Sequence, residues 1–160
     1  MTSPLLLELK PNQWNLLNEV AELDREAFAE DGLTPANLVL LCHSGRIFIL
    51  QEENVIIASA IFLPTDVFRE FLLFSLAVRP SFRRQGKGGL LLQSILATLA
   101  REGCTRLILT VGPENQPALS LYTHRLGFRQ IARLPDHFGP GKDRLLMEKV
   151  LIMADLPKTC

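Results

Sequence analysis

Apolar and polar residues follow one another along the chain in patterns that predict a mixture of helices and strands. Four segments show helical apolar spacing or helix-end signals, and they span residues 12–28, 33–45, 87–103 and 117–127. Short apolar runs are typical of strands, and they span residues 5–10, 46–52, 54–64, 70–80, 105–111, 128–134 and 144–151. Because helices and strands do not alternate strictly, the order predicts an α/β fold with a mixed sheet (α+β). Its central twisted sheet should hold about seven strands flanked by about four helices.

Local signals support two of these assignments. In the segment 33–45, Thr34 is suited to an N-cap and Pro35 to a first helical turn. Gly45, the last residue of the segment, would lie just beyond the end of the helix itself. The next two strands are separated only around Glu53 and Asn54, which predicts a hairpin.

The composition indicates one globular domain over residues 1–152, followed by a C-terminal tail over 153–160. The chain has 160 residues, and 48% of them are hydrophobic, enough for a substantial core. Lys plus Arg and Asp plus Glu both number 17. A formal net charge of zero gives no general attraction to nucleic acid or to an anionic membrane.

Several classes of protein are disfavoured by the sequence. Its apolar runs fall short of the ~20 residues of a membrane-spanning helix, and the N-terminus lacks the basic start of a secretory signal. The cysteines, Cys42, Cys104 and Cys160, are too widely spaced for a disulfide framework or a metal cluster. We therefore expect a cytoplasmic protein with no metal site, no nucleic acid and no membrane as partner.

The stretch "RRQGKGGLLL", residues 83–92, joins a predicted strand to a predicted helix. A helix N-terminus presents unpaired N–H groups to an anion, and glycines let a phosphate approach the backbone. Ser81 and Gly88 exclude a Walker A loop, and Leu91 excludes a dinucleotide fingerprint. The loop alone leaves two interpretations, a phosphate-binding site or a solvated basic loop with glycine hinges.

Two stretches together resemble the GNAT superfamily of acyl-CoA N-acyltransferases, over roughly residues 1–150. The first reads Leu76-Ala77-Val78, Pro80 and Arg83-x-x-Gly86-x-Gly88. The second reads Asn115, Ala118, Leu121, Tyr122, Gly127 and Phe128. Either alone is moderately specific, whereas both in this order are strong.

The resemblance implies acetyl-CoA as co-substrate. Backbone N–H groups from Arg84 to Gly89 would hold its pyrophosphate, and the Arg83 and Arg84 side chains would add charge. The pantetheine arm would pair with a strand edge exposed where two strands splay apart, and Asn115 would help to hold it. The implied cofactor-binding residues are Leu76, Ala77, Val78, Arg83, Arg84, Gln85, Gly86, Lys87, Gly88, Gly89 and Asn115.

The resemblance also implies direct acyl transfer from the thioester to a primary amine. A backbone N–H near Val78 would polarise the carbonyl, and Tyr122 would be the general acid that protonates the departing thiolate. Without the surrounding motif, Tyr122 would be interpreted as an amphipathic core residue.

The general base is not evident. Many relatives carry a glutamate at a position that matches Leu72 or Phe74 here. Glu70 could act through a water chain, but the sequence favours a solvated charge at the end of a strand.

The acceptor is a primary amine of a peptide or a small molecule. The segment "LPDHFGPGKDRLLMEK" resembles the final hairpin of the ribosomal-protein alanine N-acetyltransferases, which favours a peptide or protein amine. These enzymes carry a glutamate twelve residues before the tyrosine, where this chain has Thr110, so an amino acid, polyamine or antibiotic stays open as acceptor. A non-catalytic acyl-CoA sensor is the alternative to an enzyme. The sequence leaves the oligomeric state open, and a homodimer could use the C-terminal strand or the tail.

Overall fold

The computed structural model describes residues 2–152, and its internal contacts divide the chain into two compact units. The first unit comprises Met1–Pro64 and Phe74–Ile95, and the second comprises Thr65–Leu73 and Leu96–Cys160. Two elements belong to both units: strand β4 (Glu70–Val78) begins in the second, and helix α3 (Lys87–Arg101) begins in the first. The single domain expected from the sequence stays a prediction. The predicted tail, 153–160, lies outside the described residues.

The predicted α/β fold with a mixed sheet is confirmed. In the described part of the chain, seven hydrogen-bonded strands follow the order β1-β2-β3-β4-β5-β7-β6. The remaining elements of the first unit are β1 (Leu5–Glu8), α1 (Trp14–Phe28), α2 (Pro35–Ser44), β2 (Arg46–Glu52) and β3 (Val55–Pro64). Those of the second are β5 (Arg106–Val111), α4 (Gln116–Ser120), β6 (Arg129–Leu134) and β7 (Arg144–Val150). Over residues 2–152, no helix combines the length and the apolar character that crossing a membrane requires.

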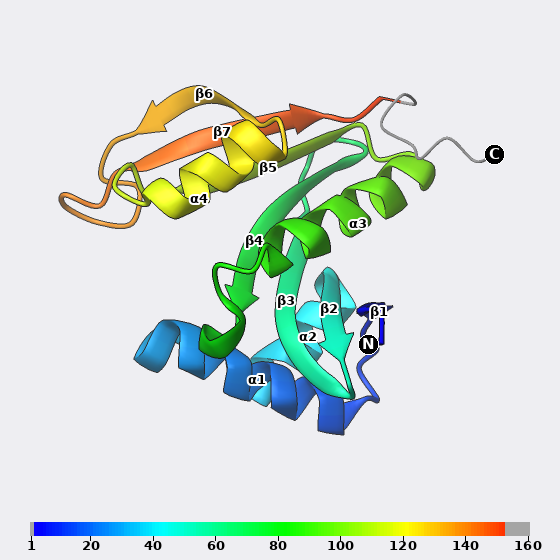
Figure 1. The fold of residues 1–160 in the computed structure, drawn as a ribbon. Helices are drawn as coiled ribbons and strands as arrows, with labels where there is room; N and C mark the ends of the chain where they lie inside the picture. Colours follow the sequence, from blue (N-terminus) through cyan, green and yellow to red (C-terminus); the bar gives the residue numbers. More distant parts are fainter. Residues whose placement is uncertain (1, 153–160) are drawn as a thin grey trace. The chain divides into compact units, whose positions relative to one another are not determined.

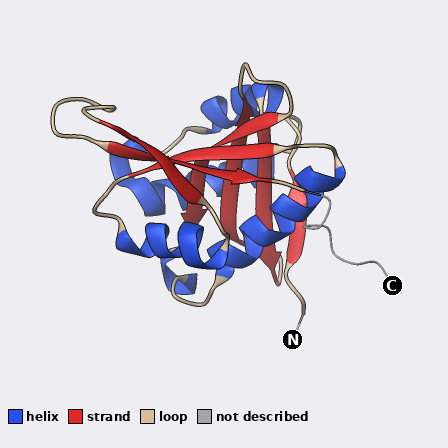
Figure 2. Ribbon diagram, turned by 90° about the horizontal axis from the view of Figure 1, so that it is seen from above, coloured by secondary structure: helices blue, strands red, loops and turns tan. Residues whose placement is uncertain are grey.

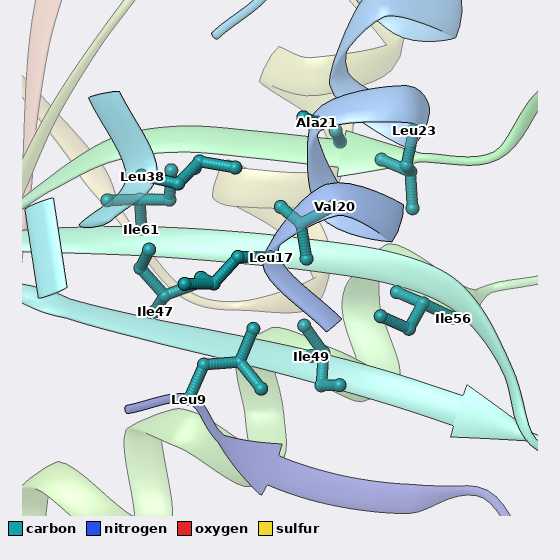
Figure 3. Packing of buried hydrophobic residues seen from close by; sticks show 11 residues of the cluster. Leu9, Leu17, Val20, Ala21, Leu23, Leu38, Ile47, Ile49, Ile56 and Ile61 are labelled. Atoms are coloured by element: carbon teal, nitrogen blue, oxygen red, sulfur yellow. The ribbon is translucent and has the colours of Figure 1, made fainter. Parts of the chain in front are cut away.

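The core of the first unit lies between its two helices and its strands. Helix α1 contacts α2 and β3, and α2 contacts both β2 and β3. Figure 3 shows Leu17 and Val20 of α1 beside Ile47 and Ile61 of the sheet, all of them buried. Burying side chains of this size stabilises the fold by roughly 1.5–3 kcal/mol each, so the helical spacing in residues 12–28 is explained by this contact.

Both local signals in the first unit are confirmed. The Thr34 hydroxyl accepts a hydrogen bond from the Asn37 backbone N–H at 3.2 Å, and the Asn37 side chain accepts one from the Thr34 N–H at 3.0 Å. Gly45 follows α2 where a Cβ would lie 2.3 Å from the Phe62 carbonyl oxygen, so the helix ends where the chain passes close to β3. Glu53 and Asn54 both have positive φ, as a two-residue hairpin turn requires.

In the second unit, β5, β7 and β6 lie side by side as antiparallel neighbours (Figure 1). Strand β4 pairs in parallel with β5 over three residue pairs, from Glu70–Arg106 to Leu72–Ile108. The splaying of these two strands farther along stays a prediction. The connection between β6 and β7 is the long loop at the left of Figures 1 and 2.

Asp24 is an ionisable residue buried in the apolar core of the first unit. It is 1% exposed, its Oδ2 accepts a hydrogen bond from the Leu33 backbone N–H at 2.6 Å, and its Oδ1 has no partner in the described residues. Burial raises the pKa of this carboxyl above its usual 3.8, although the Leu33 N–H opposes the rise. The folded state therefore prefers the protonated form.

We expect Asp24→Asn to raise the thermal unfolding midpoint at pH 7 by a few degrees, corresponding to about 1 kcal/mol. Because folding raises this pKa, the favourable contribution of the protonated Asp24 is complete below the unfolded pKa of ~3.9 and is lost as the pH rises through the folded value. The increase in the unfolding midpoint of Asp24→Asn over the wild type should therefore become smaller as the pH is lowered toward 4 in thermal unfolding scans. The exposed Asp31→Asn is the control with the same charge change. A gain that did not depend on pH would contradict this account of Asp24.

Candidate functional site

The loop between β4 and α3 presents a row of backbone N–H groups without acceptors. After the 3-10 helix Pro80–Phe82, the backbone has positive φ at Arg84 (60°) and Gly86 (73°). The Leu90 N–H donates to the Gly86 carbonyl at 3.0 Å, which is the first hydrogen bond of α3. In the described residues, no backbone hydrogen bond is donated by any N–H from Arg84 to Gly89. Free N–H groups at a helix N-terminus are the arrangement that the predicted phosphate-binding site requires.

The side chains of this loop differ in the charge that they leave available. Arg83 and Arg84 are exposed and form no ion pair in the described part of the chain, although Arg83 Nε donates to the Val78 carbonyl at 3.1 Å. Lys87, in contrast, forms an ion pair with Glu52 at the end of β2. Two arginines can therefore attract an anion, whereas the Lys87 charge is compensated and contributes less than the sequence suggested.

The other loop side chains stabilise the turn. Gln85 Nε2 donates to the Ser81 carbonyl at 3.2 Å. Gly88 and Gly89 lie in the first turn of α3, and Gly88 is half-buried whereas Gly89 is buried.

The end of β4 orients the backbone of the predicted oxyanion donor. The Arg79 N–H donates to the Ile57 carbonyl of β3 at 2.9 Å. Successive N–H groups of an extended chain point to opposite edges, so the Val78 N–H points away from β3. Ala77 is buried in the core and anchors this strand end, whereas Leu76 and Val78 are half-buried.

A pocket of ≈340 Å³ adjoins the loop in the first unit. It is lined by Thr2, Glu52, Glu53, Val55, Phe82 and Lys87. Lys87 and Glu52, which form an ion pair, are thus both part of the wall of this pocket.

Tyr122 lies in the second unit, in a local geometry that the sequence did not predict. The helix predicted for 117–127 is divided into α4 and a π-helical turn, Leu121–Arg125, because the Leu126 N–H reaches the Leu121 carbonyl at 3.0 Å. Single π turns often occur at functional sites. This turn places Tyr122 against Phe128, with ring centroids 5.8 Å apart.

The Tyr122 hydroxyl is strongly biased toward its protonated form. The residue is only 8% exposed, and burial raises its pKa to about 12. The positive charge of Arg144 opposes this rise. Among the described residues of its unit, none forms a hydrogen bond with this hydroxyl. The Tyr122 O–H group is therefore a proton donor that no described residue of the unit accepts.

Asn115 is the N-cap of α4. Its Oδ1 accepts a hydrogen bond from the Ala118 N–H at 3.3 Å. This bond uses the side-chain oxygen and leaves the NH₂ group as a donor, and the binding role that the resemblance implies for Asn115 stays a prediction.

One expectation about the general base is wrong. Glu70 is not a solvated charge at a strand end, because it is 4% exposed, accepts a hydrogen bond from Thr65 Oγ1 at 2.8 Å and forms an ion pair with Arg106. Arg106 also pairs with Glu148, which in turn pairs with Arg129. The sheet register juxtaposes Glu70 with Arg106, a long-range contact that the sequence does not display.

Arg144 is a residue of this region that sequence reasoning missed. It begins β7, donates to Thr110 of β5 and lies over the ring of Phe138. Phe138 and Thr110 are 28 residues apart in the sequence, and the pairing of β5 with β7 places Arg144 in contact with both. In the described range 2–152, no cluster of three or more His, Cys, Asp or Glu residues could hold a metal ion.

The sequence profile of the acetyltransferase (GNAT) family matches residues 14–128. The protein therefore belongs to this family, and the predicted membership is confirmed.

Curated relatives include the [ribosomal protein bS18]-alanine N-acetyltransferase of Escherichia coli K12, at 36% identity over 88 residues. That match covers 55% of this chain and 57% of the relative. The crystal structure of the corresponding Escherichia coli enzyme has a TM-score of 0.81 at 23% identity and covers 99% of both chains. A family member from Elizabethkingia anophelis, solved with acetyl-CoA bound, has a TM-score of 0.73 at 19% identity over 92% of this chain and 98% of that one. Both structures share the fold.

Because Tyr122 is the only tyrosine in the chain, tyrosinate absorbance reports its titration directly. We expect a midpoint near 12 in the folded protein and near the ordinary 10.0 in denaturant. Folding raises this pKa, so the associated stability is complete below pH 10 and is lost as the pH rises through 12.

Arg144→Gln should shift the folded midpoint farther upward, since it removes the charge that favours tyrosinate. Arg125→Gln, at an exposed position in the same turn, is the matched control. A folded midpoint at 10 would show that Tyr122 is not desolvated.

Proposed function

We propose that the protein is an acetyl-CoA-dependent N-acetyltransferase that acetylates a primary amine of a peptide or protein. The observation that carries this proposal is the row of unpaired N–H groups from Arg84 to Gly89, beside two uncompensated arginines. A pyrophosphate is a suitable ligand because its oxygens accept several hydrogen bonds and its charge is stabilised by the helix dipole. The family match and the acetyl-CoA bound to the Elizabethkingia relative support this choice of co-substrate.

The reaction is a direct transfer. The nitrogen of a neutral amine attacks the thioester carbonyl carbon, a C–N bond forms, and the C–S bond breaks. The Val78 N–H stabilises the charge that develops on the carbonyl oxygen. Tyr122 donates its proton to the departing thiolate, and the proton released by the amine passes to solvent.

Tyr122 suits the role of acid better than that of base. A phenol with a pKa of about 12 remains protonated at neutral pH, and its hydroxyl has no acceptor among the described residues of its own unit. Glu70 is not assigned as the base, since Arg106 and Thr65 already occupy its oxygens. An α-amine, with a pKa of ~8, needs less help in losing its proton than a lysine side chain at ~10.4. The chemistry therefore favours a peptide N-terminus as acceptor, in agreement with the similarity to the bS18-alanine enzymes.

We expect acetyl-CoA to raise the unfolding midpoint by several degrees. A ligand at ~100 times its dissociation constant adds ~2.7 kcal/mol if it binds only the folded state. Gly86→Ala should reduce this shift, because a Cβ at the helix start obstructs the phosphate. Gly141→Ala is the matched control, since both glycines have φ of 73° and nothing lies within 4 Å of the Gly141 position. The absence of a shift at millimolar acetyl-CoA would reject the proposed co-substrate.

Tyr122→Phe should lower kcat by roughly 100-fold or more while it leaves the acetyl-CoA-induced shift intact. The phenyl ring preserves the contact with Phe128 and removes only the hydroxyl. Release of the CoA thiol in the presence of an amine gives the rate. An unchanged kcat would exclude Tyr122 as the general acid, and no thiol release from the wild type with any amine would favour the acyl-CoA sensor.

A further inference from the structure

Arg144 is held in a fixed position in the second unit. Its Nε donates to Thr110 Oγ1 at 3.3 Å, its Nη2 donates to the Thr110 carbonyl at 2.9 Å, and its Cζ lies 5.1 Å from the centre of the Phe138 ring. Two hydrogen bonds and one aromatic face restrain a guanidinium in a defined plane. Its remaining nitrogen, Nη1, donates to no residue in the described chain and is available to a ligand.

The charge of Arg144 is restrained but not neutralised. In the described part of the chain, no carboxylate lies within ion-pair distance of it, whereas Arg129 and Arg133 each pair with one and Arg106 pairs with two. The neighbouring Asp143 is already occupied, because it accepts hydrogen bonds from Arg133 and from the Asp136 backbone N–H. A half-buried guanidinium is normally paired, so this one is suited to an anion that the chain does not supply.

The position of this charge connects it with the chemistry. Arg144 is near enough to Tyr122 to lower the pKa of its phenol against the effect of burial. Phe138, which is 60% exposed, provides apolar surface beside the guanidinium. Thr110, which fixes Arg144, occupies the position where the bS18-type enzymes are expected to carry a glutamate. The local charge in this protein is therefore positive, whereas a glutamate at position 110 would make it negative.

We propose that Arg144 binds a carboxylate of the acceptor, so that the preferred acceptor is a peptide with an acidic side chain close to its N-terminal amine. This inference rests on the proposed function and adds the class of substrate. Arg144 donates a charge-assisted hydrogen bond from Nη1 to that carboxylate, and it repels acceptors with a lysine or arginine at the same place.

The test compares acetylation of three peptides that differ only at the second residue, which is Asp, Asn or Lys. We expect kcat/KM to be highest for the Asp peptide, roughly tenfold above the Asn peptide, with the difference mainly in KM. The Lys peptide should be the poorest acceptor. Arg144→Gln should remove the preference, and Arg144→Glu should reverse it in favour of Lys. Because each ratio is taken within one variant, any change in the acidity of Tyr122 cancels.

Arg125→Gln, at an exposed position in the turn that carries Tyr122, is the matched control and should keep the wild-type order. Unfolding midpoints measured with acetyl-CoA show whether each variant folds and binds the co-substrate. The Arg144→Lys variant keeps the positive charge and should therefore keep a weaker preference for the Asp peptide. Equal kcat/KM values for the Asp and Asn peptides, or an unchanged preference in Arg144→Gln, would overturn the inference while the proposed function stands. Faster acetylation of free aspartate or glutamate than of the peptides would overturn the peptide class. No transfer to any amine would reject the proposed function and this inference with it.

Discussion

An α-helix begins with N–H groups that no residue of the helix can accept, and the proposed function depends on this constraint. At the start of α3 the number of such groups is larger than usual. Within the described residues, the preceding turn and the first helical turn together leave six consecutive N–H groups, Arg84 to Gly89, without backbone acceptors. Most helices satisfy part of this need with a polar N-cap side chain. Gly86 offers none, and the first turn contains two further glycines. The need is met at low cost only by water or by an anion with several acceptor oxygens.

The two units solve the problem of internal charge differently. In the first, Asp24 is buried with one unpartnered oxygen, and its carboxyl shifts toward the neutral form. In the second, Glu70, Arg106, Glu148 and Arg129 form a continuous series of ion pairs in which each buried acid has a partner. Arg144 fits neither pattern, since it is held by a threonine and an aromatic ring and forms no ion pair with any residue from 2 to 152. A charge that is restrained without being neutralised is well suited to recognise a ligand.

Reasoning from sequence succeeded where information is local. Thr34, Pro35 and Gly45 delimit α2 as expected, and the hairpin turn at Glu53 and Asn54 follows from two adjacent residues. It failed at Glu70, because an acidic residue at a strand end is usually solvated, and only the register with Arg106 shows otherwise. It also missed the π turn at Tyr122, which inserts one extra residue into a pattern that reads as an ordinary helix.

The sequence by itself determined the order of elements, the family and the position of the glycine-rich loop, since each depends on residue types at fixed spacings. The tertiary structure decided which charges are free. Lys87 is neutralised by Glu52 and Glu70 by Arg106, whereas Arg144 is held by Thr110 and has no counter-ion among the residues that the structure describes. These partners are separated by 35, 36 and 34 residues along the chain. Strand pairing and packing bring them together, and no spacing rule in a single sequence specifies such a contact.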